Sequence, residues 1–273
     1  MNLSQVKLVV TDMDGTLLNS KHEVSPLFLQ LFKKLIKHDI IFVAASGRPY
    51  YGMVDKLSEI KDDIIIVAEN GGLAIHENNV FLSNPILEKN FKSIISIIGT
   101  VENAHPVFCT QDRAYVMSKS HQLLNLLSEY YHNYKVINHP REIVEEVYKV
   151  ALFHEESSEK HIYPHIRVLE SDFKVKLSAT HWVDISENIA NKGTAIKHIQ
   201  KKYNISDEET LAFGDYNNDL EMLENAYFSF AMANAHPLVK SVARFETKSN
   251  NDLGVEIILQ KLLMEKEKLV FKP

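Results

Sequence analysis

VVTDMDGT, at residues 9–16, joins an apolar run to two aspartates that stand two positions apart. The run at residues 6–10 predicts a short buried strand, and extended backbone at its end would point the Asp12 and Asp14 carboxylates to one side. Two carboxylates held that close repel each other, so a cation is expected beside them, and Mg²⁺ is a hard cation that prefers oxygen ligands. Gly15 has no Cβ and allows a sharp turn beside a bound group. The stretch therefore predicts a metal-binding strand end.

A plainer interpretation of the same residues is a β-hairpin. Asp14-Gly15 is a common two-residue hairpin turn, and it stands here between the apolar segments 8–10 and 17–18. The stretch alone leaves both interpretations open.

The composition is that of an ordinary globular protein. The chain has 273 residues, of which 45% are hydrophobic and 24% are charged, enough for a full core and for two domains. A formal net charge of −6 argues against a general surface for nucleic acid or anionic membrane. The single cysteine, Cys109, cannot form an intrachain disulfide, and the sequence shows no secretion signal and no apolar run of about 20 residues. We therefore expect a cytoplasmic protein in which Cys109 is a small buried side chain.

The first 70 residues alternate between strand and helix patterns. Ser25-Pro26 predicts a helix start, with serine as the N-cap and proline in the first turn. Apolar runs at 40–45 and 64–67 predict strands buried on both faces of a parallel sheet, and a helix is predicted over 49–60. Alternation of this kind is typical of α/β folds.

The pattern changes at about residue 73 and returns to α/β near residue 191. Hairpins and amphipathic helices in between predict an α+β unit with an antiparallel sheet. The strands predicted there are 73–75, 80–82, 107–110, 115–117, 147–153, 173–178 and 182–185, and the helices are 87–98, 122–131 and 158–169. After it we predict helices at 191–203, near Pro237 and at 254–266, and strands at 210–213 and 227–231. The simplest organisation is a core domain of residues 1–83 and 187–273 with an inserted domain of residues 84–186.

Polar residues follow the predicted strands of the α/β part, where ligands bind in open α/β sheets. They are Asp12 and Asp14, Ser46 and Gly47, Asn70 and Gly71, and Asp215. Lys192 follows the N-cap candidate Asn191 at a helix start, a place that disfavours a cation unless an anion binds there. Alone, Lys192 would be interpreted as a solvated surface lysine, and Asp and Asn are also common in turns. The convergence of these positions favours a ligand site over the hairpin.

These segments resemble a known family. DMDGTL (12–17), SGR (46–48), KG (192–193) and GDYNND (214–219) resemble, in order and spacing, the four motifs of the haloacid dehalogenase superfamily of phosphatases. AENGG (68–72) and the insertion resemble its Cof-type, class IIB cap subfamily. The resemblance implies a Rossmann-like parallel-sheet core with an inserted α+β cap. It also implies an Mg²⁺-dependent phosphatase of small phosphorylated metabolites, such as sugar phosphates, with neither a nucleic acid nor a membrane as partner.

The resemblance assigns roles to single residues. Asp12 is implied as the nucleophile that forms an aspartyl-phosphate, and Asp14 as the general acid and base. The implied Mg²⁺ ligands are Asp12, the backbone carbonyl of Asp14 and Asp215, supported by Asp219 and Asn218 directly or through water. The implied phosphate-binding groups are Ser46, the Gly47 amide, Lys192 and Asn218. Two alternatives stay open, a phosphomutase or phosphotransferase on sugar phosphates and a non-catalytic phosphometabolite-binding protein.

Other side chains are expected to be structural. His161 and His165 have the spacing of a metal-binding helix, but Pro164 lies between them and no third ligand is evident, so zinc is not expected. Trp182 is expected in the core. Packing is also the expected role of Tyr50, Tyr51, His76 and Arg113.

Overall fold

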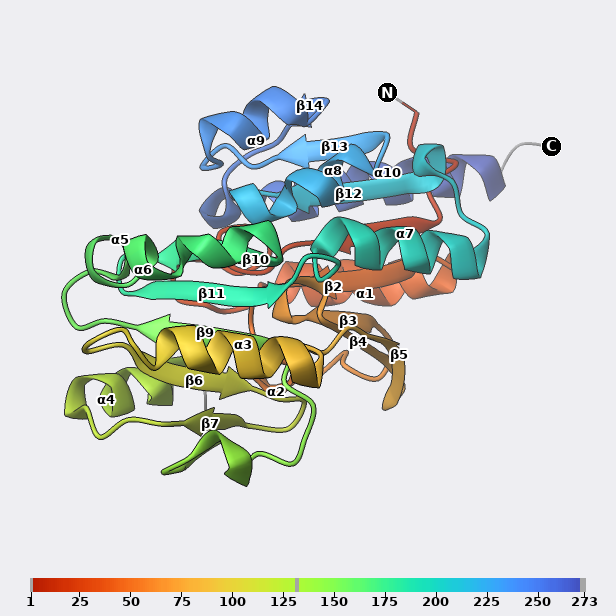
Figure 1. The fold of residues 1–273 in the computed structure, drawn as a ribbon. Helices are drawn as coiled ribbons and strands as arrows, with labels where there is room; N and C mark the ends of the chain where they lie inside the picture. Colours follow the sequence, from red (N-terminus) through yellow and green to blue (C-terminus); the bar gives the residue numbers. More distant parts are fainter. Residues whose placement is uncertain (1, 131–132, 271–273) are drawn as a thin grey trace.

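A computed structural model describes residues 2–130 and 133–270 as two β-sheets with helices packed on each (Figure 1). The strands of the first sheet come from residues 8–83 and 210–246, and those of the second from residues 105–187. The chain therefore leaves the first sheet, builds the second and returns. This arrangement confirms the predicted α/β fold with an inserted α+β unit. The strands predicted at 73–75 and 80–82 are a correction, because they belong to the first sheet and not to the α+β unit. The domain boundaries at 83/84 and 186/187 stay a prediction.

The first sheet is parallel from β14 to β3 and ends in an antiparallel hairpin. Its order is β14 (Phe245–Glu246), β13 (Phe228–Ala231), β12 (Thr210–Gly214), β1 (Leu8–Thr11), β2 (Ile41–Ala45), β3 (Ile65–Ala68), β4 (Leu73–His76) and β5 (Asn79–Ser83). Every residue of β1, β3, β12 and β13 is buried. Burial on both faces explains why these strands are continuous apolar runs in the sequence.

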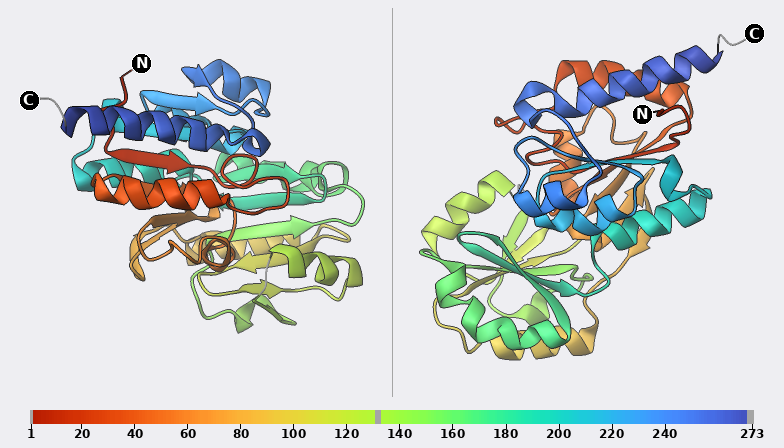
Figure 2. Two further views of the ribbon diagram at one scale, coloured as in Figure 1. Left: turned by 180° about the vertical axis from the view of Figure 1, so that it is seen from behind. Right: turned by 90° about the horizontal axis from the view of Figure 1, so that it is seen from above.

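Helices cover both faces of this sheet (Figure 2). α1 (Pro26–Lys37) and α10 (Gly254–Val270) lie side by side on one face, and α7 (Lys192–Tyr203) and α8 (Leu220–Glu224) lie on the other. α2 (Tyr50–Lys56) follows β2, and α9 (Pro237–Val242) follows β13. Ser25 caps α1 by accepting a hydrogen bond from the Phe28 backbone, as predicted, whereas α2 is shorter than the predicted 49–60.

The second sheet is antiparallel apart from its β7–β8 pair. Its order is β10 (Phe173–Ala179), β11 (Trp182–Glu187), β9 (Lys149–Phe153), β6 (His105–Cys109), β7 (Ala114–Val116) and β8 (Tyr134–Val136). One face packs against α3 (Glu88–Ile98) and α6 (Tyr163–Ile166), and the other against α4 (His121–Tyr130). α5 (Ser158–His161) contacts β10 and β11. Cys109 is buried in the cluster on the α4 face, as expected.

The second sheet and its helices depart from the prediction in two places. The helix predicted over 158–169 is broken, because α5 ends at His161 and a 3-10 turn, Arg167–Ser171, follows α6. Pro164, in the first turn of α6, has no backbone N–H for a continuous helix. β8 was not predicted, because its residues are largely exposed and form no apolar run. The predicted helix end at Tyr131 lies outside the described residues.

Across residues 2–130 and 133–270, none of the helices combines the length and apolar character that crossing a membrane requires.

Candidate active site

The carboxyl ends of β1, β2, β3 and β12 meet at one edge of the first sheet, since these neighbouring strands are parallel. A cavity of about 450 Å³ lies between this edge and the second sheet. The first sheet's side of the cavity is lined by Asp12, Asp14, His22, Ser46, Gly47, Arg48, Asn70, Asp215 and Asn218. The strand ends singled out in the sequence therefore surround a single cavity.

Asp12, Asp215 and Asp219 form an acidic group at this edge. One oxygen atom from each carboxylate lies within 4.8 Å of the others, and Asp12 and Asp219 are buried. Burial raises the pKa of Asp12 and raises the pKa of Asp215 to about 6, with the Asp219 carboxylate adding to both shifts. A buried set of carboxylate oxygens is the donor set that a hard cation such as Mg²⁺ prefers.

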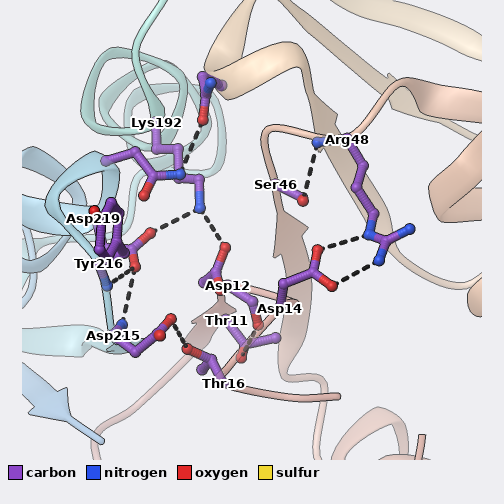
Figure 3. A network of polar contacts seen from close by, with 12 residues as sticks. Thr11, Asp12, Asp14, Thr16, Ser46, Arg48, Lys192, Asp215, Tyr216 and Asp219 are labelled. Atoms are coloured by element: carbon purple, nitrogen blue, oxygen red, sulfur yellow. Dashed lines mark hydrogen bonds and ion pairs between the residues drawn. The ribbon is translucent and has the colours of Figure 1, made fainter. Parts of the chain in front are cut away.

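Lys192 supplies an ammonium to this acidic group (Figure 3). Its Nζ donates to Asp12 Oδ1 at 2.5 Å and to Asp219 Oδ1 at 2.7 Å, and the side chain is fully buried. Burial alone would lower the pKa of Lys192, but the two carboxylates raise it above its ordinary value. The residue begins α7, which Asn191 caps by accepting a hydrogen bond from the Thr194 backbone at 2.7 Å. The single ammonium offsets only part of the negative charge of the three carboxylates, so a further positive charge is favoured at this place.

Backbone and hydroxyl donors hold the other two carboxylates in place. Asp219 Oδ2 accepts hydrogen bonds from the backbone N–H groups of Asp215 and Tyr216, at 3.0 Å each. Thr16 Oγ1 donates to Asp215 Oδ1 at 3.0 Å. Gly15 has a φ of +80°, and a Cβ on it would lie 2.3 Å from Asp215 Oδ2. The turn after β1 and the loop after β12 therefore fit together because residue 15 is glycine.

The hairpin interpretation of Asp14-Gly15 is wrong. Residues 17–18 form no strand with β1, and a single bridge joins Asp14 to Leu18. β1 instead pairs with β2 and β12 on its two sides.

The Asp14 carboxylate points away from the acidic group and toward Arg48 (Figure 3). Arg48 donates from Nε to Asp14 Oδ2 at 2.6 Å and from Nη2 to Oδ1 at 2.7 Å, and His22 Nδ1 lies 3.0 Å from Oδ1. Burial would raise the pKa of Asp14, but the paired hydrogen bonds and charge of Arg48 lower it below its ordinary value. The spacing of Asp12 and Asp14 predicts one cation beside both carboxylates. That expectation is corrected here, because Asp12 and Asp14 have separate partners.

The loop after β2 is bonded to the loops after β3 and β12. Ser46 Oγ accepts a hydrogen bond from the Arg48 backbone at 3.1 Å, and the Ser46 carbonyl accepts one from the Asn70 backbone at 2.9 Å. Asn70 Oδ1 in turn accepts from Asn218 Nδ2 at 3.0 Å. These bonds hold Ser46, Gly47 and Asn218 on the cavity wall, whereas Lys192 and Asp219 are fully buried.

Lys149, on β9 of the second sheet, reaches the loops of the first. Its Nζ lies 2.7 Å from Glu69 Oε2, donates to the Gly47 carbonyl at 2.9 Å and lies 3.8 Å from Asp184 Oδ2. Lys149 and Glu69 are both buried. Burial raises the pKa of Glu69 and would lower that of Lys149, but the Glu69 and Asp184 carboxylates raise the Lys149 pKa instead. A buried ion pair therefore joins the two sheets at the cavity.

The second sheet forms the opposite wall of the cavity, with Lys149, Lys176, Ser178, Ala179, Trp182 and Asp184. The expectation that Trp182 is a core residue is wrong in part. Its ring lies 5.0 Å from that of Phe153, but the side chain is half-buried and also faces the cavity.

The side chains expected to be structural stay outside this site. Among the residues that the structure describes, the cavity lining does not include Tyr50, Tyr51, His76 or Arg113. His161 and His165 stand on separate helices, and in the described ranges neither joins a group of three metal-binding side chains.

The roles of Arg48 and of the second sheet's wall were not predicted from the sequence. Arg48 stands in the SGR segment, two positions after Ser46, but its partner is 34 residues away. The alternation of polar and apolar residues in β10 indicates that one face of the strand is polar. The pattern does not show that this polar face lines the cavity.

Comparison with known proteins agrees with this geometry. Residues 9–259 match the family model of the haloacid dehalogenase-like hydrolases. The chain is 28% identical to the 5-amino-6-(5-phospho-D-ribitylamino)uracil phosphatase YbjI of Escherichia coli (strain K12), over 94% of this chain and 96% of that protein. It is 28% identical to the phosphatase YwpJ of Bacillus subtilis (strain 168), over 94% of this chain and 100% of that protein.

A solved structure agrees as well. SMU.1108c from Streptococcus mutans UA159 has a TM-score of 0.86 and 30% identity, covering 95% of this chain and 99% of that chain. Since the family model extends over most of the sequence, this chain belongs to the haloacid dehalogenase-like hydrolases and is a phosphatase of that family.

Proposed function

We propose that the protein is an Mg²⁺-dependent phosphatase that hydrolyses small phosphorylated metabolites through an aspartyl-phosphate at Asp12. The observation that carries the proposal is the acidic group of Asp12, Asp215 and Asp219 beside a cavity of small-molecule size. Sugar phosphates and similar compounds are the proposed substrate class. The name of the Escherichia coli relative, which contains a phosphoribityl group, supports that class.

The acidic group fits Mg²⁺ by its chemistry. Asp12, Asp215 and Asp219 would hold the metal, with the Asp14 carbonyl and Asn218 as further candidate ligands. When bound, the metal would balance the carboxylates and offset the charge of the phosphoryl group that has to approach them.

Asp12 is the proposed nucleophile because its carboxylate lies at the cavity. It would attack the phosphorus atom, and the alcohol would leave. Burial raises the pKa of Asp12, and Lys192 opposes that shift, so Lys192 favours the ionised carboxylate that the attack needs. The phosphoryl oxygens would be bound by Ser46, the Gly47 amide and Asn218. The buried Lys192, which contacts Asp12, would add positive charge to the site.

Asp14 is the proposed general acid and base. Its contact with Arg48 favours the carboxylate form, which suits the second step, where a water molecule loses its proton as it attacks the aspartyl-phosphate. In the first step Asp14 would give a proton to the leaving alcohol. A phosphate dianion beside it raises its pKa, and substrate binding therefore favours the protonated form.

The organisation around the site is also proposed. Residues 84–186 would form a cap of the Cof-type, class IIB kind on a core of residues 1–83 and 187–273, and the cap would exclude bulk water from the intermediate. We further propose a cytoplasmic protein that binds neither nucleic acid nor membrane.

Removal of the metal tests the proposed function. The purified protein is expected to release phosphate from p-nitrophenyl phosphate with Mg²⁺, to lose about 100-fold or more of that rate in excess chelator, and to recover it when Mg²⁺ is restored. Chelator-insensitive hydrolysis would contradict the metal dependence. Product analysis with sugar phosphates separates hydrolysis, which gives free phosphate, from transfer to a second sugar. Hydrolysis of none of these esters would favour a phosphometabolite-binding protein.

Gly15→Ala is expected to lower kcat/KM on p-nitrophenyl phosphate by about 100-fold, because the new methyl group displaces Asp215 and a small shift of a catalytic group costs that much. The left-handed backbone at residue 15 adds a loss of about 1–2 kcal/mol in the free energy of unfolding. Gly99→Ala is the control, since Gly99 is exposed at the end of α3 with a φ of −64°. Wild-type activity in Gly15→Ala would show that the turn tolerates a side chain.

A further inference from the structure

Lys176 lies on the cavity wall that the second sheet forms, whereas the nearby Lys174 does not line the cavity. Lys174 and Lys176 stand two positions apart on β10, so their side chains leave the same face of the strand. Val175 and Leu177, between and after them, pack in the cluster on the opposite face. Lys176 lines the cavity, whereas Lys174 donates to Glu221 Oε1 at 3.2 Å.

The other cationic side chains of the cavity wall have carboxylate partners. Arg48 and His22 contact Asp14, and Lys149 contacts Glu69. Within residues 2–130 and 133–270, no hydrogen bond or ion pair reaches the Lys176 ammonium. Its cross-strand neighbour is Asp184, whose carboxylate lies instead 3.8 Å from Lys149.

The surroundings of Lys176 disfavour a charge without a partner. Burial, together with the positive charges of Lys174 and Lys192, lowers the pKa of Lys176 to about 8. An anionic group in the cavity would reverse this balance, because it would accept a hydrogen bond from the half-buried ammonium and place a negative charge beside it. The phosphoryl group already has its proposed ligands on the first sheet, so a second anion is the group that Lys176 is placed to meet.

We propose that Lys176 is a specificity-determining residue that binds a second anionic group, on the leaving group of the substrate. This inference rests on the proposed phosphatase function and narrows its substrates to phosphomonoesters that carry another carboxylate or phosphate. The ammonium acts on the leaving group from the second sheet, while the first sheet holds the phosphoryl group that is hydrolysed.

Two three-carbon phosphate esters test the proposal. Glycerol 3-phosphate and 3-phosphoglycerate have the same phosphate and the same chain length, but the second has a carboxylate where the first has a hydroxymethyl group. Wild-type protein is expected to have the higher kcat/KM on 3-phosphoglycerate. Lys176→Met is expected to lower the ratio of the two kcat/KM values by about 10–100-fold, the usual effect of one hydrogen bond to a charged group. Lys176→Arg is expected to keep most of the ratio.

Lys174→Met is the matched control, because it removes a lysine from the same strand and face without touching the cavity. It is expected to leave the ratio unchanged. An unchanged ratio in Lys176→Met, including an equal loss on both esters, would overturn the proposal, since Lys176 would then act on the shared phosphate or on neither.

Binding gives a readout that does not depend on turnover. In an Asp12→Asn background, calorimetry is expected to show tighter binding of 3-phosphoglycerate than of glycerol 3-phosphate, and loss of that difference when Lys176→Met is added. If no ester is hydrolysed but this difference is found, the phosphatase proposal fails while the role of Lys176 stands. If esters are hydrolysed and the difference is absent, the role of Lys176 fails alone.

Discussion

Asp12→Asn is expected to lower the rate of p-nitrophenyl phosphate hydrolysis by about 10⁴-fold or more, as loss of a covalent nucleophile does in other enzymes. The amide of asparagine is a poor nucleophile, and it also removes one negative charge from the acidic group. The fold is expected to persist, because Lys192 keeps its contact with Asp219 and one source of carboxylate repulsion is gone. The measurement is the rate with Mg²⁺, together with the thermal unfolding midpoint.

Asp55→Asn is the control for this substitution, since Asp55 is exposed on α2 and lies outside the cavity lining. It is expected to keep wild-type activity. An Asp12→Asn protein that retains even a few per cent of the rate would rule out Asp12 as the nucleophile.

Lys149→Met is expected to lower the free energy of unfolding by about 3–5 kcal/mol, because it leaves the buried Glu69 carboxylate without its cation. Adding Glu69→Gln removes the stranded charge, so the double variant is expected to recover most of the loss. Activity is not expected to recover with stability, since the Gly47 carbonyl still lacks the hydrogen bond from Lys149. Denaturant unfolding of the single and double variants measures both parts of this prediction.

The same substitution has an expected pH dependence. Burial already raises the pKa of Glu69, and loss of Lys149 removes the group that opposes that shift. In Lys149→Met, Glu69 therefore takes up a proton as the pH falls, and the neutral form is cheaper to bury. The destabilisation is expected to be smaller at pH 5 than at pH 8.

Lys197→Met is the control for the buried pair, because Lys197 pairs with Asp207 at a surface where both side chains are about half exposed. Exposed pairs of this kind contribute about 0–1 kcal/mol. If Lys149→Met were as mild as this control, the buried pair would not hold the two sheets together.

Much of the fold could be predicted because its signals are local. The parallel strands are buried on both faces and appear as apolar runs, and the Ser25 cap follows from two adjacent residues. The positions of Asp12, Ser46 and Asp215 at one sheet edge follow from strand direction alone, since the carboxyl ends of parallel strands meet. Pro164 was noticed in the sequence as an argument against a metal site, and its effect on the helix follows from the same missing N–H.

The pairing of side chains across the site was beyond local signals. Asp14 pairs with Arg48, which follows another strand of the first sheet. Glu69 pairs with Lys149, which lies on the second sheet, 80 residues further along the chain. These pairs depend on how the strand ends and the two sheets pack against each other, and the hydrophobic periodicity of the sequence carries no information about that packing. The same applies to Lys174 and Lys176. The sequence pattern does not distinguish the two lysines, but in the fold Lys174 contacts Glu221 and Lys176 lines the cavity.

The Glu69–Lys149 contact also sets a rule for building chimeras from relatives of this protein. Under the proposed division of the chain, residues 84–186 carry one half of a buried charge pair, and the core of residues 1–83 and 187–273 carries the other half. A cap transplanted from a relative that lacks a lysine at this place would leave Glu69 stranded, and a core without the glutamate would strand the incoming lysine. Exchange of substrate specificity between such enzymes is therefore expected to succeed when the residues at positions 69 and 149 are transferred as a pair.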